Sequence, residues 1–154
     1  MQEASTRDLD RLMEGWDELV RRFPGEKRAL LERLGPKMLQ AVRQQIGGSG
    51  KVAGWQAPYM GSGGGYTGVR ARADTYQTTK GGKRYAVGYI TNRIEGGHRI
   101  SKPRGGKNYT SRVQVAAVPG LWFYDAVRQG LPSMAQGEIS DLLEIITAGL
   151  EGRL

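Results

Sequence analysis

Positive charge and glycine are concentrated in the middle of this 154-residue chain, and this uneven distribution restricts its folding more than any other feature. Residues 47–119 carry twelve Lys and Arg against two Asp and Glu, a net charge of +10, and hold sixteen of the 24 glycines. Residues 1–46 carry nine against eight, and residues 120–154 carry two against five. Neither end can bury an apolar helix face alone. We therefore expect one domain over 1–154, with helical ends and a basic, glycine-rich centre.

The N-terminal segment, residues 1–46, is predicted to be helical. Apolar side chains recur every three or four residues up to Phe23, and Pro24-Gly25 is expected to end this first helix. A second apolar series runs across Gly35-Pro36 to Ile46, which predicts a kinked helix or two abutting helices that Gly47-Gly48 ends. The apolar positions are Leu9, Leu12, Trp16, Leu19 or Val20, Phe23, Leu30, Leu31, Leu34, Met38, Val42 and Ile46.

The centre is predicted to form a β-meander between glycine-rich loops. Residues 47–65 show no apolar period and many turn formers, so we expect a long loop there. Stretches rich in alternating, aromatic or β-branched residues predict strands, and two basic segments containing glycine predict loops. The predicted strands are 66–73, 84–91 and 111–118, the hairpin tip is Lys80–Lys83, and the second basic loop is Lys102–Lys107.

Helices are predicted again at the C-terminus. Pro119-Gly120 is expected to open a short helical stretch, and Pro132-Ser133 the last helix. The order of elements favours an α+β fold, in which an antiparallel sheet of three to four strands has helices packed on one face. The last helix is expected to bury Ile139, Leu142, Leu143, Ile146 and Leu150, and Leu121, Trp122 and Phe123 are too apolar to lie in water.

Catalytic and metal sites find little support in the sequence. The absence of cysteine excludes disulfides, Cys-type zinc sites and thiol catalysis. The only histidine, His98, would serve as a general base oriented by Glu95. A lone histidine of this kind more often lies at a strand end or in a turn, which is the interpretation we prefer. Gly61–Gly65 lacks the Lys-Ser/Thr ending of a phosphate-binding loop. We expect no enzymatic activity and no catalytic, metal or cofactor-binding residues.

The length and polarity of the chain predict a soluble protein without a membrane partner. No apolar run is long enough to cross a membrane, and the N-terminus lacks the apolar region of a secretory signal.

The basic centre is expected to meet an anionic partner, either nucleic acid or an acidic surface of a neighbouring subunit. Its positive residues are interleaved with tyrosines, which suit both stacking on bases and half-buried sheet positions. Trp122, Phe123 and Tyr124 are expected to lie in the core rather than in an interface. The candidate contacts to subunits or to DNA in a channel are Lys80, Lys83, Arg84, Arg99, Lys102, Arg104 and Lys107.

Three segments in this order resemble the tail-completion or neck proteins of tailed bacteriophages and phage-tail-like particles. These are small head–tail connector proteins, similar to tail terminators. The first segment is the end of the long helix, VRQQIGGSG (Val42–Gly50). The second is YAVGYITNRIEGGHR (Tyr85–Arg99), similar to an aromatic strand that runs into a Glu-Gly turn, and the third is VPGLWFYDAVRQG (Val118–Gly130). The resemblance covers residues 20–150, and the glycine-rich stretch 47–65 departs from the family's shorter segment.

The resemblance implies a virion structural protein without catalysis. Members form rings at the end of the tail tube, where they stop its polymerisation and dock the head, so we expect a homo-oligomeric ring, hexameric or dodecameric. The expected partners are the tail tube and the neck or connector proteins, with non-specific contacts to DNA in the channel. The expected location is the head–tail junction or tail end of a virion assembled in the host bacterial cytoplasm.

Two alternatives remain open at this point. One is a basic nucleic-acid-binding module, whose affinity would fall steeply with salt. The other is a small basic nuclease of the ribonuclease-toxin kind, with His98, Glu95, Arg93 and Arg99.

Overall fold

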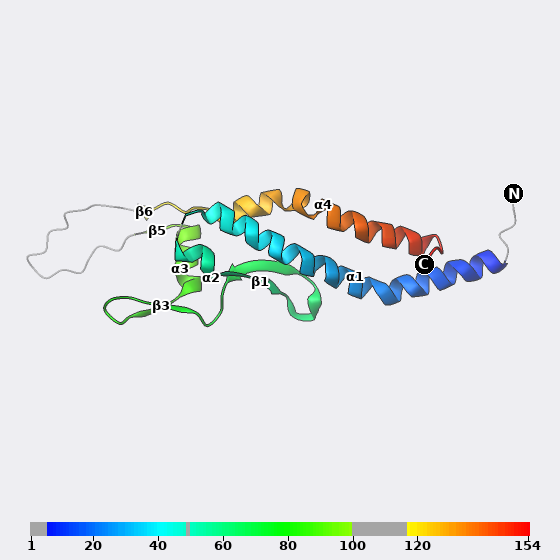
Figure 1. Cartoon of the computed structure of the whole chain (residues 1–154), viewed down its shortest axis with the longest axis horizontal. Helices are drawn as coiled ribbons and strands as arrows, with labels where there is room; N and C mark the ends of the chain where they lie inside the picture. The colour runs from blue at the N-terminus through cyan, green and yellow to red at the C-terminus, as the bar shows by residue number, and fades with distance from the viewer. Residues whose placement is uncertain (1–5, 49, 100–116) are drawn as a thin grey trace, which may run out of the picture. The chain divides into compact units, whose positions relative to one another are not determined.

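The computed structural model describes residues 6–48, 50–99 and 117–154 (Figure 1). The chain mixes helix and sheet, with a long helix near each end. In chain order the elements are α1 (Thr6–Ile46), α2 (Lys51–Trp55), β1 (Gln56–Met60), the 3-10 helix η1 (Ser62–Gly64), β2 (Thr67–Ala71), β3 (Tyr76–Thr78), β4 (Arg84–Ala86), α3 (Val87–Glu95), β5 (His98–Arg99), β6 (Ala117–Val118) and α4 (Phe123–Leu150).

The chain divides into two compact units. The first, which we call the helical unit, comprises the described residues of Met1–Leu39, Pro58–Val69 and Gly130–Leu154. The second, the hairpin unit, comprises those of Gln40–Ala57 and Arg70–Gln129. Each is described below by itself, and the single domain remains a prediction.

The N-terminal helix does not end at Pro24-Gly25, so that expectation is wrong. α1 continues from Thr6 to Ile46 with Pro24 and Pro36 inside it. A proline removes one intrahelical hydrogen bond, but the apolar series stays in phase on both sides of it and keeps the helix together. The helix ends at Gly47 as expected, where φ is +63° and the N–H donates to Arg43 O at 3.1 Å.

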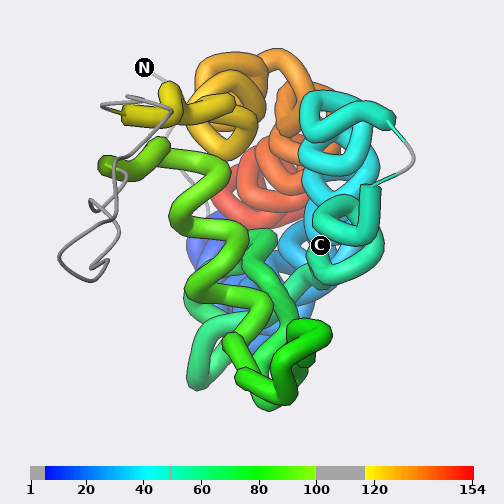
Figure 2. The backbone as a smooth tube through the Cα atoms, turned by 90° about the vertical axis from the view of Figure 1, so that its left-hand side faces the viewer, coloured from blue at the N-terminus to red at the C-terminus, as the bar shows by residue number. Residues whose placement is uncertain are grey.

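The core of the helical unit lies between α1 and α4, which run antiparallel and side by side (Figures 1 and 2). Leu30 and Leu34 of α1 are buried together with Ala135 of α4. A close approach of α1 to the end of α4 and the turn after it needs glycine at Gly15, because a Cβ there would lie 2.8 Å from Gly149 O and 2.6 Å from Gly152 Cα. Further along, Glu138 accepts hydrogen bonds from Arg33 Nε and, at 2.7 Å, from Lys37 Nζ.

Residues 47–65 are not one long loop, which corrects a second expectation. They contain α2, β1 and η1, and β1 pairs with β2 in a two-stranded sheet. Within the helical unit the turn of this hairpin is closed by Gly61 N–H, which donates to Tyr66 O at 2.8 Å. The Thr67 hydroxyl donates to Tyr59 O at 3.1 Å, and the rings of Tyr59 and Tyr66 meet edge to face. Local polar and aromatic contacts therefore order a segment that lacks any apolar period.

The described strands form three two-stranded sheets and not one sheet of three to four strands, so the predicted sheet is wrong. Residues 84–91 are strand only to Ala86, after which α3 begins. Val87 and Thr91, four residues apart, are 0% and 1% exposed, so burial at helical spacing overrides the β propensity of this segment. Of the predicted strand 111–118, only Ala117 and Val118 are described, and they form β6 beside β5.

The C-terminal helix is continuous from Phe123 to Leu150 with Pro132 inside it, so Pro132-Ser133 does not open a separate helix. Leu142 and Ile146 are half-buried, but the other residues of the expected buried face are exposed: Ile139, Leu143 and Leu150. Ahead of the helix, Leu121 and Trp122 are about 60% exposed, against the expectation of a buried cluster, whereas Phe123 is buried as predicted. Tyr124 is half-buried.

Candidate functional site

The strongest candidate site lies on the β3–β4 hairpin of the hairpin unit. Its strands pair antiparallel with Thr78 opposite Arg84, and Thr79 N–H donates to Lys83 O at 2.9 Å across the turn. Gly82 occupies a left-handed conformation with φ of +80°, which suits glycine in a tight turn. The predicted hairpin tip at Lys80–Lys83 is therefore confirmed.

Three of the predicted contact residues share this hairpin. Lys80, Lys83 and Arg84 are exposed, and none takes part in the ion pairs between described residues. The hairpin tip therefore carries three positive charges that pair with no carboxylate of the described residues, which favours an anionic partner. Arg84 also lies over the ring of Tyr76, 4.5 Å from its centroid. This arrangement keeps the arginine extended over an aromatic face.

A row of aromatic and cationic side chains continues from the hairpin into α3, and we call it the tyrosine ladder: Tyr85, Tyr89 and Arg93. The rings of Tyr85 and Tyr89 stack with centroids 6.2 Å apart and planes inclined by 19°, and the Arg93 guanidinium lies 5.1 Å from the Tyr89 centroid. The two rings are 40% and 50% exposed. Sequence reasoning missed this ladder. The four-residue spacing of Tyr89 and Arg93 is a helical signal, but Tyr85 lies on β4, where that rule does not apply.

The other predicted contact residues are not all brought to this hairpin. Arg99 is exposed on β5, in a short pair with β6. Lys102, Arg104 and Lys107, with the whole second basic loop, lie outside the described residues. The candidate site therefore consists of the hairpin cations and the tyrosine ladder.

A buried polar cluster fixes the position of α3, the helix that carries Tyr89 and Arg93. Gln56 is fully buried, and its Nε2 donates to Val52 O at 3.0 Å and to the Thr91 hydroxyl of α3 at 3.4 Å. The Tyr124 hydroxyl donates to Gln56 Oε1. Burial, and then the negative charge of Glu95, raise the pKa of Tyr124 to about 12. The phenol therefore stays protonated and acts as a structural donor at neutral pH.

Glu95 and His98 have separate partners in this structure. Glu95 Oε1 accepts the backbone N–H of Tyr124 at 3.1 Å, which places the carboxylate at the start of α4. His98 Nδ1 lies 3.4 Å from Arg93 O. These contacts join α3 to its neighbours, and they give a nuclease role for Glu95 and His98 no geometric support.

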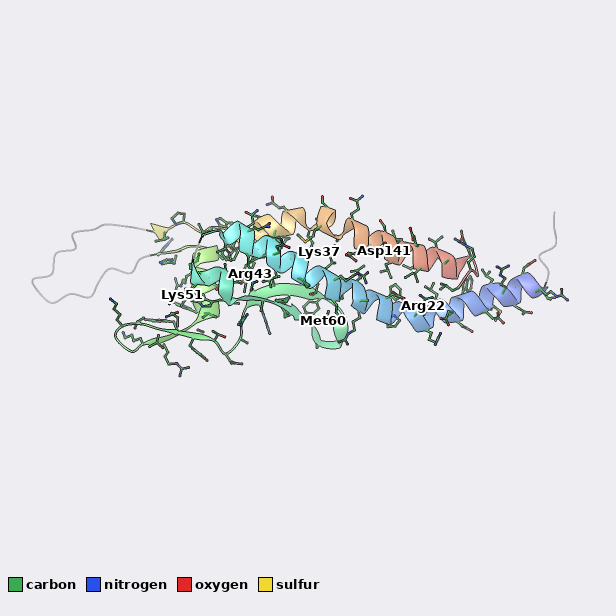
Figure 3. The ribbon with its side chains drawn as sticks, viewed as in Figure 1. Arg22, Lys37, Arg43, Lys51, Met60 and Asp141 are labelled. Atoms are coloured by element: carbon green, nitrogen blue, oxygen red, sulfur yellow. The ribbon has the colours of Figure 1, made fainter. Side chains whose placement is uncertain are left out.

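Elsewhere in the hairpin unit, Arg43 near the end of α1 donates from Nε to Ala53 O at 3.2 Å and so holds α2 (Figure 3). Lys51, at the start of α2, is exposed (Figure 3).

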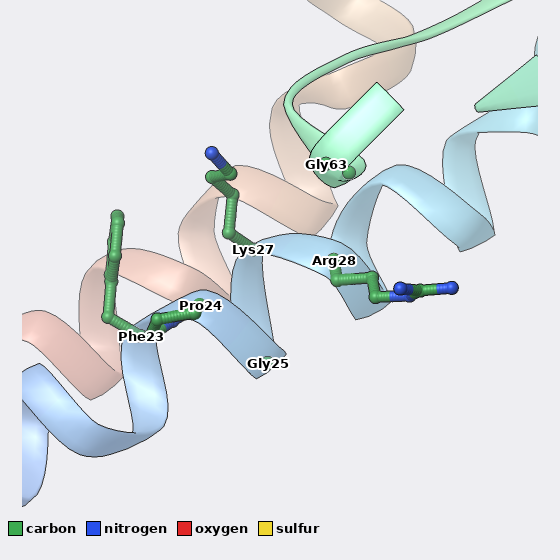
Figure 4. A pocket seen from close by; sticks show the side chains of 7 residues that line it. Phe23, Pro24, Gly25, Lys27, Arg28 and Gly63 are labelled. Carbon is green, nitrogen blue, oxygen red and sulfur yellow. The ribbon is translucent and has the colours of Figure 1, made fainter. Parts of the chain in front are cut away.

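A hollow of about 380 Å³ lies in the helical unit, between α1 and η1 (Figure 4). Its lining includes Phe23, Lys27, Arg28 and Gly64. Arg28 already donates to Glu32 at 2.8 Å, and Gly64 N–H donates to Gly61 O at 3.0 Å. Arg28 and Gly64 are therefore occupied. Lys27 is the one cation of this lining outside the ion pairs of the described residues, against three at the hairpin tip, so the hollow is the weaker anion site.

The described residues contain no group of three or more acidic, His or Cys side chains that could hold a metal ion. None of their helices is long and apolar enough to span a bilayer. A comparison of the chain with models of protein families found no match, and comparisons with curated proteins and with solved structures found none either.

Proposed function

We propose that this chain is a non-enzymatic virion protein that forms a homo-oligomeric ring at the head–tail junction of a tailed bacteriophage or phage-tail-like particle. The ring completes or terminates the tail and joins it to the neck. The proposal starts from the sequence resemblance of the long helix, the Tyr85–Arg99 segment and the Val118–Gly130 segment to tail-completion proteins.

One observation carries the proposal: the hairpin tip is basic, and part of α4 exposes carboxylates. The hairpin tip holds Lys80, Lys83 and Arg84 without an ion-pair partner among the described residues. α4 exposes the carboxylates Asp141 and Glu144 in the helical unit. A closed ring uses two different patches on each subunit, and opposite charges favour such head-to-tail pairing and suppress pairing of like patches.

The test is the mass of the full-length protein by light scattering, alone and with isolated tail tubes of its particle. A single multimeric mass, or rings on tube ends in electron micrographs, is expected. The Lys80→Glu/Lys83→Glu variant should lose the ring, whereas Lys51→Glu, an equally exposed lysine outside the hairpin, should keep it. A wild-type protein that stays monomeric and does not bind the tail tubes would overturn the proposal.

The tyrosine ladder favours a second candidate function, the binding of nucleic acid without sequence readout. Exposed tyrosine rings stack on unpaired bases, and the neighbouring cations contact phosphates. Tyr85, Tyr89 and Arg93 offer the rings and a cation in one row. Lys83 and Arg84 precede this row in the chain, and Arg84 lies on the other face of the hairpin, over Tyr76.

This second function is tested by titrating fluorescently labelled single-stranded and duplex DNA at several salt concentrations. We expect the logarithm of the affinity to fall linearly with the logarithm of the salt concentration. Absence of binding to either form at low salt would overturn it.

A further inference from the structure

Five large apolar side chains of α1 form an exposed stripe in the helical unit. Their exposed fractions run from 37% for Phe23 to 74% for Val20. Their spacing alternates between four and three residues, which is the heptad pattern of helices that pack along one another. The stripe consists of Leu9, Met13, Trp16, Val20 and Phe23.

α4 carries a matching stripe with the same alternation. Ile139, Leu143 and Leu150 are between 44% and 54% exposed, and the half-buried Ile146 lies between them in the series. The helix therefore packs only part of its apolar surface against α1.

Both stripes lie on the same face of the α1–α4 pair. The sides of the helices that meet are marked by Leu19 and Gly149, since a Cβ on Gly149 would lie 2.6 Å from Leu19 Cβ. Successive residues of a helix are about 100° apart around its axis. Counted from Leu19 on α1 and from Gly149 on α4, each stripe is centred roughly a quarter turn away, in the direction of increasing residue number. The helices are antiparallel, so equal rotations in one sense point to one face (Figure 1). We call this combined surface the apolar face.

The charges beside the α1 stripe change sign along the helix. Asp10 and Asp17 flank its first half, and Arg21 and Arg28 flank its second half, where they also pair with Glu18 and Glu32 of the same helix. If the α1 helix of a second copy packed parallel to this one, like charges would lie together. An antiparallel one would place the acidic half of each helix against the basic half of the other, so the edge is complementary to itself only in the antiparallel arrangement.

We propose that the α1 stripe binds the α1 stripe of a second copy of this chain in a two-fold symmetric dimer, with the two α1 helices antiparallel. Heptad positions then pair Met13 with Phe23 of the second copy and Trp16 with Val20 of the second copy. The five half-exposed α1 side chains offer on the order of 500 Å² for each subunit, which is the small end of specific interfaces. A two-fold contact uses one patch twice, so this dimer is distinct from the head-to-tail contact of a ring and does not depend on it.

Sedimentation of the full-length protein over a range of concentrations provides the first test. We expect a dimer that the stripe variants Val20→Glu and Met13→Glu each weaken at least tenfold in dissociation constant. The matched control is Leu121→Glu, which introduces the same charge at a similarly exposed apolar position in the hairpin unit. Circular dichroism shows whether each variant remains folded.

Cysteine pairs provide the second test, because the natural chain has no cysteine. Met13→Cys/Phe23→Cys should oxidise to a covalent dimer, since the two positions meet across the interface and are too far apart along one helix to bond internally. Met13→Cys alone should remain uncrosslinked, because the antiparallel arrangement keeps the two copies of residue 13 apart. A crosslink in the single variant would indicate a parallel pair and overturn the proposal.

The outcomes separate this dimer from the proposed ring. Lys80→Glu/Lys83→Glu should leave the cysteine crosslink intact even when it abolishes the ring. A wild-type protein that stays monomeric at high concentration, or a larger assembly whose mass Val20→Glu and Met13→Glu leave unchanged, would overturn the dimer.

Discussion

The backbone N–H of Tyr124 donates a hydrogen bond to Oε1 of Glu95 at 3.1 Å, and this bond joins the last residue of α3 to the first turn of α4. Backbone bonds reinforce the junction, with Leu121 N–H donating to Ile94 O at 2.9 Å and Trp122 N–H to Glu95 O at 3.1 Å. Residues that close this junction are far apart in the chain, so the hairpin unit depends on it for its tertiary structure.

Glu95→Ala should destabilise the protein by about 1–3 kcal/mol, because a helix N–H loses its acceptor inside the structure. Glu95→Gln keeps an oxygen in the same place and should cost less. The measurement is the urea midpoint of unfolding followed by circular dichroism. Equal midpoints for wild type and Glu95→Ala would show that the bond contributes nothing.

The phenol of Tyr124 should ionise late, with a pKa of about 12 in the folded protein. An exposed tyrosine ionises near pH 10, so between these values the unfolded chain releases a proton that the folded chain retains. This group's contribution to stability is therefore lost as the pH rises through that window. Ultraviolet titration of the phenolate should lose its latest step in Tyr124→Phe, and a step that persists in this variant would contradict the assignment.

Gly15 and Gly25, both within α1, should respond oppositely to alanine. A Cβ on Gly15 would lie 2.6 Å from Gly152 Cα and 2.8 Å from Gly149 O, so Gly15→Ala should destabilise the helix pair by about 1–3 kcal/mol. Gly25 has nothing within 4 Å of the same position, and Gly25→Ala should stabilise α1 by about 0.5–1 kcal/mol. Thermal unfolding of the two variants checks both signs, and a stabilising Gly15→Ala would contradict the close approach.

Tyr89→Leu should weaken single-stranded DNA binding by about tenfold, because the ladder loses its central ring while retaining its charges. Tyr66→Leu, which removes an equally exposed tyrosine from the helical unit, is the control and should bind as wild type does. Lys83→Ala should instead lower the salt dependence by about one unit of slope. Equal effects of Tyr89→Leu and Tyr66→Leu would argue against the ladder.

Local signals in the sequence predicted several elements correctly. The stop of α1 at Gly47 and the hairpin tip at Lys80–Lys83 depend on neighbouring residues, and both are confirmed. The predicted single sheet failed because Val87 and Thr91 are buried at helical spacing, a tertiary effect that outweighs their β-branched side chains.

The expectation that a proline marks a helix boundary was wrong at two positions, because the free-energy cost of a proline inside a helix depends on its surroundings. Pro24 and Pro132 lie inside long helices, since packing on both sides compensates for one lost hydrogen bond. The cations of the candidate site were predictable from charge alone. The tyrosine ladder was not, because the stacking of Tyr85 on Tyr89 follows from the strand-to-helix transition at Ala86.

The pairing of β5 with β6 sets Arg99 opposite Ala117, so residues 100–116 start and finish at neighbouring points of the hairpin unit. This stretch carries four cations and no carboxylate. The entropy of closing a loop grows only with the logarithm of its length, so extra residues between fixed ends cost little. Because Arg99 and Ala117 lie opposite each other, a reporter domain whose own termini are close together can be inserted between β5 and β6 without forcing the two strands apart.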